Sequence, residues 1–160
     1  VRGPMVMKEY WNLPEETAKA LRDGWMHSGD AAYVDEDGFF YIVDRIKDMI
    51  ITGGENVYSL EVENVIGQME GVQQVAVIGV PEPFWGEIVH AVVVPKDGAE
   101  LTADGVIEFC KARIARYKSP RSVEFRSALP VTGAGKISKK TLREDRVATA
   151  DATQDAEKPR

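Results

Sequence analysis

The sequence of 160 residues has little cysteine and little histidine, with Cys110 as its one cysteine and two histidines. A single thiol cannot form a disulfide within the chain, and so few thiols and imidazoles argue against a structural zinc site. No run of 18 or more apolar residues occurs, which excludes a membrane-spanning helix. The N-terminal residues also lack the apolar stretch of a signal peptide. We therefore expect a cytoplasmic protein.

Charge is unevenly distributed along the chain, whose net charge is −6. The first 110 residues carry 20 acidic and seven basic side chains, whereas residues 111–126 carry six basic side chains and one acidic one. Residues 136–146 add five basic side chains against two acidic ones. This distribution predicts a local anionic ligand and argues against general nucleic-acid binding. The alternative, that the basic side chains only solvate helix faces, stays open.

Hydrophobic periodicity and turn residues predict an α+β fold, in which helices pack on a small sheet of the three-stranded type after a β-rich segment. Gly24 is interpreted as the end of the first helix and Ser59 as the N-cap of the second, and the third helix is expected after Thr102. The predicted helices are 12–24, one through Leu60 to Met69, one through Val106 to Ile114, and 138–146. The predicted strands are 31–34, 39–43, 49–52, 72–80, 88–95 and 123–126.

The segment Asp44-Arg-Ile-Lys-Asp48 interrupts the apolar pattern and is the predicted boundary between two parts of the chain. Residues 1–44 would form the end of one domain, and residues 45–147 a second domain. The remaining residues, 148–160, are polar and without periodicity, which predicts a disordered tail.

Several short motifs could carry chemistry, but each alone has an ordinary structural interpretation. The residues Ser28-Gly29-Asp30 could form a capped turn, and Gly53-Gly54 a turn between strand and helix. The segment ending in Lys136 fails the phosphate-loop pattern, because Pro130 replaces the first glycine and Ile137 follows the lysine. Cys110 lies on the apolar face of its helix and is interpreted as a buried thiol.

Taken in order, these motifs resemble the C-terminal part of the adenylate-forming acyl-CoA synthetases, the superfamily that includes firefly luciferase and the adenylation domains of peptide synthetases. The resemblance covers about residues 4–146 and rests on four segments: Ser28-Gly29-Asp30, Asp44 to Tyr58, Tyr117 to Arg121, and Leu129 to Ile137. Departures from the family pattern are Ser28 for Thr, Asp44 for Gly, and Ser59-Leu60 for Pro-Ala.

The resemblance implies that the enzyme joins a carboxylic acid to CoA in two half-reactions, through an acyl-adenylate made from ATP. Asp30 would accept hydrogen bonds from the ribose hydroxyls, and Arg45 would donate further hydrogen bonds nearby. Lys136 is the implied catalytic residue, because its ammonium would neutralise charge at the α-phosphate and the attacking carboxylate.

For the second half-reaction, the resemblance implies that the C-terminal domain rotates about a hinge at Lys47. Gly53 and Gly54 would then line the tunnel for the pantetheine arm of CoA, since glycine leaves room for a narrow ligand. Candidate contacts for the CoA phosphates are Arg116, Lys118 and Arg121. The alternative, that these three side chains solvate a helix end, stays open.

The family's phosphate loop, its Mg²⁺-associated glutamate motif and its acyl pocket are absent from this sequence. We therefore expect a fragment that is inactive alone, whose partners are its own N-terminal domain, ATP, CoA and a carboxylic acid, with Mg²⁺ bound mainly by that domain. The acid is predicted to be a fatty acid, and a homo-oligomer is left open. The alternatives are an aryl-acid or carrier-protein ligase and a non-catalytic interaction module.

Overall fold

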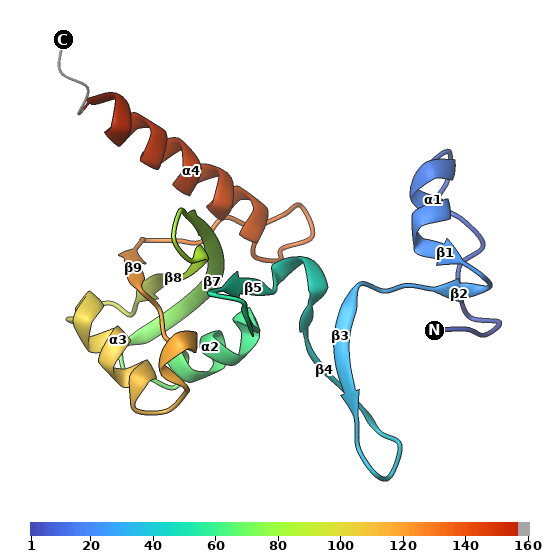
Figure 1. The fold of residues 1–160 in the computed structure, drawn as a ribbon, viewed down its shortest axis with the longest axis horizontal. Coiled ribbons are helices and arrows are strands. Elements are labelled where there is room, and N and C mark those ends of the chain that lie inside the picture. The colour runs from blue at the N-terminus through green and yellow to red at the C-terminus, as the bar shows by residue number, and fades with distance from the viewer. Residues whose placement is uncertain (157–160) are drawn as a thin grey trace. The chain divides into compact units, whose positions relative to one another are not determined.

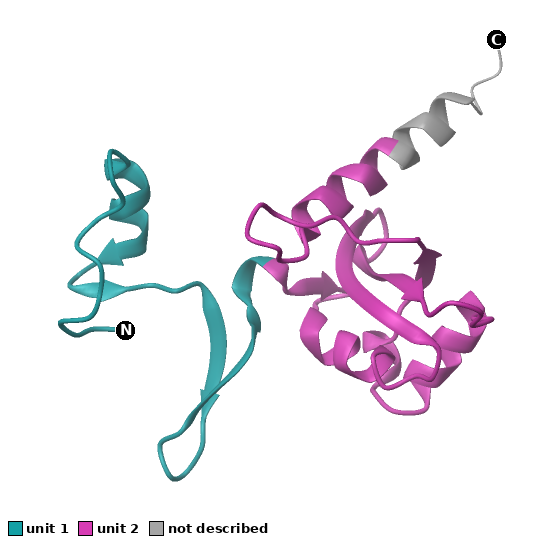
Figure 2. Cartoon of the chain, turned by 180° about the vertical axis from the view of Figure 1, so that it is seen from behind, with its two compact units in different colours: residues 1–47 teal, residues 48–160 magenta. Residues whose placement is uncertain are grey.

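The chain folds into two compact units, Val1–Lys47 and Asp48–Arg160, which Figure 2 colours separately. The structure, a computed structural model, describes the backbone of residues 1–156 and the side chains of residues 1–148. The boundary between the units falls within the predicted segment Asp44–Asp48, three residues after the domain end predicted at Asp44. Lys47 and Asp48 therefore stand on either side of the junction.

Unit 1 begins with helix α1 (Pro14–Ala20) and a two-residue hairpin, β1 (Leu21–Arg22) and β2 (Trp25–Met26). The predicted helix over 12–24 was too long at this end. Asp23 and Gly24 adopt positive φ angles of 52° and 77°, the geometry of a tight hairpin turn. Gly24 therefore turns the chain between two strands and does not end a helix.

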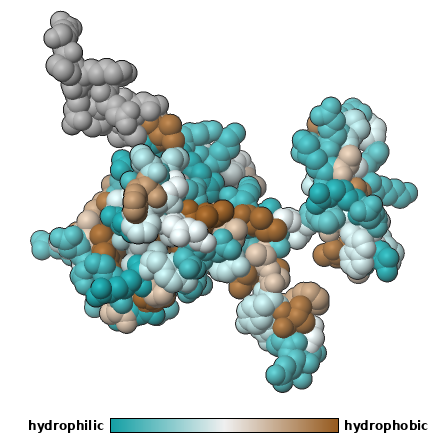
Figure 3. Space-filling view, viewed as in Figure 1, coloured by the Kyte–Doolittle hydropathy of each residue, from teal (hydrophilic) through white to brown (hydrophobic). Residues whose placement is uncertain are grey.

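The strands predicted at 31–34 and 39–43 are confirmed as β3 (Asp30–Val34) and β4 (Phe40–Arg45), which pair antiparallel as a second hairpin. Its apolar side chains are exposed: Val34 by 51%, Phe39 by 64%, Phe40 by 76% and Ile42 by 59%. Brown, hydrophobic atoms accordingly lie on the surface of this hairpin in Figure 3. All buried hydrophobic residues that the structure describes belong to unit 2.

Unit 2 contains one five-stranded sheet with the order β6-β5-β8-β7, and β9 pairs in parallel with β8. The α+β class is confirmed, but the sheet has five strands and not three, because residues 55–57 fold back on β5 and β9 adds to β8. Figure 1 shows the arrangement of unit 2. The elements of this unit are β5 (Ile50–Thr52), β6 (Glu55–Val57), α2 (Ser59–Ile66), β7 (Val72–Glu82), β8 (Gly86–Pro95), α3 (Ala103–Lys111), the 3₁₀ turn η2 (Arg116–Lys118), β9 (Ser122–Phe125) and α4 (Lys139–Ala156).

The two faces of this sheet each pack against helices. One face, with Val77 and Val93, joins Val62 and Ile66 of α2 and Val106 and Cys110 of α3 in the larger core. The other face packs against α4 in a smaller core made of Ala76, Ile78, Val92, Val94, Leu129 and Leu142. Because both faces are covered, β7 and β8 have near-continuous apolar runs.

Helix α4 extends from Lys139 to Ala156, well beyond the predicted end at residue 146. Residues 148–156 of the predicted disordered tail are therefore helical. The apolar spacing used for the prediction covers only the first turns of α4, which pack on the sheet through Leu142. Residues 157–160 lie outside the described part of the chain. Within the described part, no helix combines the length and apolar character needed to cross a bilayer.

Candidate functional site

Asp30 and Arg45, the predicted nucleotide contacts, lie side by side in unit 1. They are directly opposite each other at the open end of the β3–β4 hairpin, and Arg45 Nε lies 2.8 Å from Asp30 Oδ1. A second Arg45 nitrogen, Nη2, lies 3.5 Å from the Ser28 carbonyl oxygen. The two side chains remain 28% (Asp30) and 52% (Arg45) exposed. Hairpin register thus places an acceptor and a donor group together on an accessible surface.

Lys136 projects from a short loop of unit 2 that closes on itself. Val131 and Ile137 form an antiparallel bridge, and the Thr132 amide donates to the Lys136 carbonyl at 2.7 Å. The Thr132 hydroxyl in turn accepts a hydrogen bond from the Lys136 amide at 3.3 Å. Gly135, with a φ of 74°, provides the left-handed residue that this turn needs. The loop therefore presents an exposed lysine on a defined backbone.

Gly53 and Arg121 both contact one aromatic residue, Trp85. The Gly53 amide donates to the Trp85 carbonyl at 2.9 Å, and a Cβ at Gly53 would lie 2.9 Å from the Trp85 ring. The Arg121 guanidinium stacks on the same ring, 4.1 Å from its centroid. Gly54 has a φ of 85° and open space where a Cβ would stand. The Gly-Gly turn is thus packed against Trp85 on one side and open on the other.

Arg116 and Arg121 line one surface pocket of about 450 Å³ between α3 and the segment that follows it. Its remaining lining residues are Asp104, Ile107, Glu108, Lys111, Ser119 and Pro120. The Lys111 ammonium is paired with Glu108 at 2.7 Å. Arg116 and Arg121 are thus the cations of this pocket that carry no carboxylate partner among the described residues. Two planar guanidinium groups near one cavity suit a phosphate-bearing ligand.

Lys118, predicted together with these arginines, is engaged elsewhere. Its Nζ lies 2.8 Å from both carboxylate oxygens of Glu61 on α2, and this hydrogen-bonded partner raises the pKa of Lys118. Lys118 is not among the residues that line the pocket. The ion pair fastens η2 to α2, so the structure favours a structural contact for this lysine.

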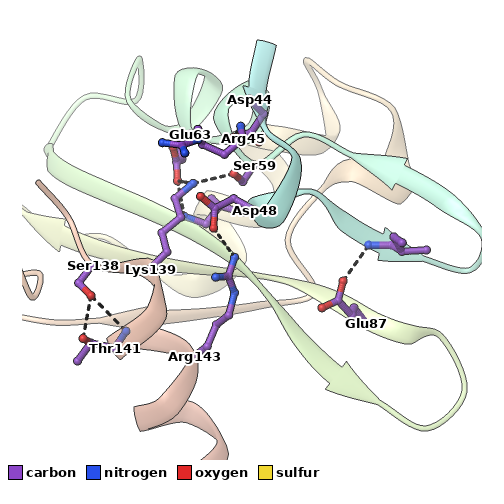
Figure 4. Close-up of polar contacts among 12 residues, drawn as sticks. Asp44, Arg45, Asp48, Ser59, Glu63, Glu87, Ser138, Lys139, Thr141 and Arg143 are labelled. Atoms are coloured by element: carbon purple, nitrogen blue, oxygen red, sulfur yellow. Dashed lines mark hydrogen bonds and ion pairs between the residues drawn. The ribbon is translucent and has the colours of Figure 1, made fainter. Parts of the chain in front are cut away.

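Lys47 is the middle residue of the single-turn 3₁₀ helix η1 (Ile46–Asp48) and the last residue of unit 1. Asp48, its neighbour, is the first residue of unit 2 and has a side chain only 11% exposed. Its Oδ1 accepts a hydrogen bond of 2.8 Å from Arg143 of α4 (Figure 4). The predicted hinge residue therefore precedes a residue fixed within unit 2.

Two residues near the predicted site have roles that the sequence did not indicate. Trp85, between β7 and β8, was not predicted as a site residue, although a tryptophan beside a glycine between two apolar strands is a usable signal. Ser59 was interpreted as an N-cap, but the N-cap of α2 is Tyr58, and the buried Ser59 hydroxyl accepts from Lys139 Nζ at 2.6 Å. Because Lys139 comes from α4, no local pattern indicates this contact.

Comparison with known proteins places these residues in a family context. Residues 61–136 match the family model described as the AMP-binding enzyme C-terminal domain. A feruloyl-CoA synthase of an Amycolatopsis species is 57% identical over 143 residues, which are 89% of this chain and 29% of that protein. A long-chain-fatty-acid–CoA ligase of Bacillus subtilis is 51% identical over 91% of this chain and 26% of that protein.

Among solved structures, ATP-bound MatB from Rhodopseudomonas palustris superimposes with a TM-score of 0.83 at 43% identity. The match covers 90% of this chain and 29% of that one. The chain thus spans less than a third of the length of these relatives, and it corresponds to a part of each of them.

Proposed function

We propose a function for this chain on the premise that it belongs to the superfamily of adenylate-forming, AMP-binding acyl-CoA synthetases, whose C-terminal domain it carries. In this proposal it is part of an ATP-dependent carboxylic acid–CoA ligase. The whole enzyme joins the acid to AMP with release of pyrophosphate, and then transfers the acyl group to the CoA thiol with release of AMP.

The observation that carries the proposal is the self-closed loop that presents Lys136. A compact ammonium group can approach both the α-phosphate and the attacking carboxylate, where negative charge accumulates in the transition state. Among the described residues, no carboxylate lies within 4.0 Å of this ammonium, so no ion pair competes with a ligand. We assign Lys136 to the adenylation half-reaction.

Asp30 and Arg45 are proposed to bind the nucleotide ribose. A carboxylate has two oxygens, so Asp30 can keep its ion pair with Arg45 and still accept hydrogen bonds from hydroxyl groups. The guanidinium has further N–H donors that the ion pair does not use. Mg²⁺ is assigned mainly to the domain that precedes this chain.

CoA is proposed to lie along the surface that joins Gly53, Trp85, Arg121 and Arg116. The open side of the Gly53-Gly54 turn leaves room for the pantetheine arm. Arg121 and Arg116 line the neighbouring pocket and would contact the phosphates of the adenosine end. Lys118 is assigned to holding η2 against Glu61. In the first half-reaction the surface with Lys136 would face the reaction centre. Rotation about Lys47 would then turn the surface with Gly53, Trp85 and Arg121 toward it.

The exposed face of the β3–β4 hairpin supports a preceding domain as the partner of unit 1. Val34, Phe40 and Ile42 share one face of the hairpin by its register, and they form an exposed apolar surface of a kind that an isolated protein rarely exposes. We propose that the upstream part of the enzyme covers this surface. That part would also contain the pocket for the acid.

The acid is proposed to be a fatty acid, as in the names of the relatives from Bacillus subtilis and Mycobacterium tuberculosis. An aryl acid is the second candidate, favoured by the 57% identity to the feruloyl-CoA synthase. Both are small carboxylic acids, and residues upstream of this chain would select between them.

The proposal is tested by ATP–pyrophosphate exchange on the full-length protein, with a panel of fatty and aryl acids. We expect exchange that depends on one class of acid and falls about a hundredfold to a thousandfold in Lys136→Ala, as is typical when a transition-state charge stabiliser is removed. Lys140→Ala is the matched control, because its 84% exposed lysine lies four residues away.

Thioester formation from supplied acyl-adenylate should change little in Lys136→Ala, because this lysine is assigned to adenylation alone. Equal loss of both half-reactions would contradict that assignment. Absence of exchange with every acid, in a folded full-length protein, would instead support the non-catalytic interaction module.

A further inference from the structure

Lys139, three residues after Lys136, is buried in a polar cluster beneath the start of α4. Its Nζ lies 2.6 Å from Ser59 Oγ and 2.7 Å from Glu63 Oε1, and the Lys139 and Glu63 side chains are only 16% and 15% exposed. Glu63 Oε1 also accepts a hydrogen bond of 2.7 Å from the Val77 amide of β7. Figure 4 shows this lysine pointing from α4 toward α2. One ion pair therefore joins the start of α4 to both α2 and the sheet.

Apolar packing holds the other end of the Lys136 loop. Leu129, which precedes the loop, is 6% exposed and packs in the smaller core with Leu142 of α4. The Ser138 amide donates to the Pro130 carbonyl at 2.8 Å, which joins the two ends of the loop. The loop thus has an apolar anchor before it and a polar anchor after it, and its own hydrogen bonds keep its shape.

Arg143, one turn further along α4, anchors the same helix to Asp48. The distance from Arg143 Nη2 to Asp48 Oδ1 is 2.8 Å, and the two side chains are 31% and 11% exposed. Asp48 is the first residue of unit 2 and directly follows Lys47. Asp48, the residue after the proposed hinge, is therefore linked through Arg143 to α4, the helix that directly follows the Lys136 loop.

We propose that Lys139 and Arg143 are positioning residues, which hold the Lys136 loop, the first turns of α4 and Asp48 in one rigid body. This inference rests on the function proposed above. When unit 2 rotates about the hinge, the Lys136 loop would then move with it as a rigid part. The change in backbone conformation would be confined to residues before Asp48. Positioning errors of about 1 Å cost an enzyme about a hundredfold in rate.

The test measures both half-reactions of the full-length enzyme with Lys139→Met and Arg143→Met. We expect each variant to lower kcat for adenylation about tenfold or more, with KM for ATP changed less than about threefold. Thioester formation from supplied acyl-adenylate should stay within about twofold. Lys139→Arg keeps the ion pair and should restore most of the adenylation rate, and Lys140→Met is the exposed control on the same helix.

Loss of stability is separated from loss of position by two double variants, Glu63→Gln with Lys139→Met and Asp48→Asn with Arg143→Met. Each removes both charges of a pair, which avoids the cost of one unpaired buried charge. We expect the Tm to recover in the double variants while adenylation stays low. Recovery of adenylation together with the Tm, or equal loss of both half-reactions in the single variants, would overturn the proposal.

Amide hydrogen exchange gives a readout that does not depend on activity. Residues 131–138 should exchange faster in Lys139→Met than in Lys140→Met, and unchanged exchange there would also overturn the proposal. A wild-type protein that adenylates no acid would contradict the proposed function. The amide hydrogen exchange of residues 131–138 would still report whether Lys139 anchors the loop.

Discussion

The guanidinium of Arg121 stacks on the indole of Trp85, 4.1 Å from the ring centroid, and this contact brings a charged residue before β9 onto the turn between β7 and β8. The same ring packs against Gly53. A planar cation held by an aromatic ring keeps its N–H groups available at the ring's edge. Arg121 is thus oriented before any ligand arrives.

Arg121→Leu is expected to raise KM for CoA about tenfold or more and to leave ATP–pyrophosphate exchange unchanged. A hydrogen bond to a charged group contributes about 1.5–3 kcal/mol, which corresponds to such a change. Steady-state kinetics with varied CoA measure it. Arg113→Leu is the matched control, because Arg113 stacks on Phe109 at 3.5 Å but does not line the pocket. Equal effects of both variants would argue against a phosphate contact at Arg121.

Gly53→Ala is expected to destabilise unit 2 more than Gly98→Ala. Both glycines have positive φ angles, 58° and 75°, so each substitution costs about 1–2 kcal/mol for the backbone. Only the Cβ at residue 53 would also meet Trp85, at 2.9 Å, whereas the one at residue 98 meets open space. Urea unfolding measures the difference. A raised KM for CoA in Gly53→Ala alone would link this turn to the thiol substrate.

Lys47→Pro should slow thioester formation from supplied acyl-adenylate about tenfold or more, because proline fixes φ at a position where rotation requires a change. Adenylation should persist, since it needs only one of the two domain positions. The comparison is Lys47→Ala, which removes the same side chain and leaves φ adjustable. Unchanged thioester rates in the proline variant would contradict a hinge at this residue.

Stability should fall as the pH drops below about 6.5, the pKa of histidine in an unfolded chain. His90 is 2% exposed, with Nδ1 2.7 Å from Ser122 Oγ. It faces Glu124 of β9, Arg126 directly after β9, and Arg146 of α4. Burial, aided by Arg146, lowers the pKa of His90. The unfolded chain therefore binds a proton first, and the free energy of unfolding declines from about pH 6.5 down to the lower folded pKa.

Urea unfolding at pH 7.5 and pH 5.5 measures this decline. It should shrink in His90→Gln and persist in His27→Gln, since His27 is exposed. An identical pH dependence in both variants would assign the decline to other groups.

Cys110 should react with a thiol reagent only when the domain opens. Its side chain is fully buried, and burial raises the pKa of the thiol to about 11. Since the thiolate is the reactive form, we expect the folded protein at pH 8 to react at least about a hundredfold more slowly than the urea-unfolded one. Ser127→Cys in a Cys110→Ala background supplies an exposed thiol for comparison. Fast labelling of native Cys110 would show that α3 opens readily.

The sequence alone determined the local features of this protein, because they depend on near neighbours. Apolar spacing identified α2 and α3, and the order of the motifs identified the superfamily. Helix α3 begins after Thr102 as expected, and the structure adds that the Thr102 side chain caps it by accepting a hydrogen bond from the Gly105 amide. The Asp23-Gly24 turn was also readable in principle, but Gly24 was interpreted as the residue that ends the helix.

Tertiary structure decided which charged side chains meet, because those contacts join residues far apart in the chain. Lys118 and Glu61 are 57 residues apart, and Lys139 and Ser59 are 80 residues apart. Their pairing follows from how α2, α4 and η2 pack around one sheet, which no local pattern encodes. The sequence predicted Lys118 as a contact for the CoA phosphates from the resemblance and the local excess of basic side chains. The fold places its ammonium 2.8 Å from Glu61, because packing sets which opposite charges lie within 3 Å of each other.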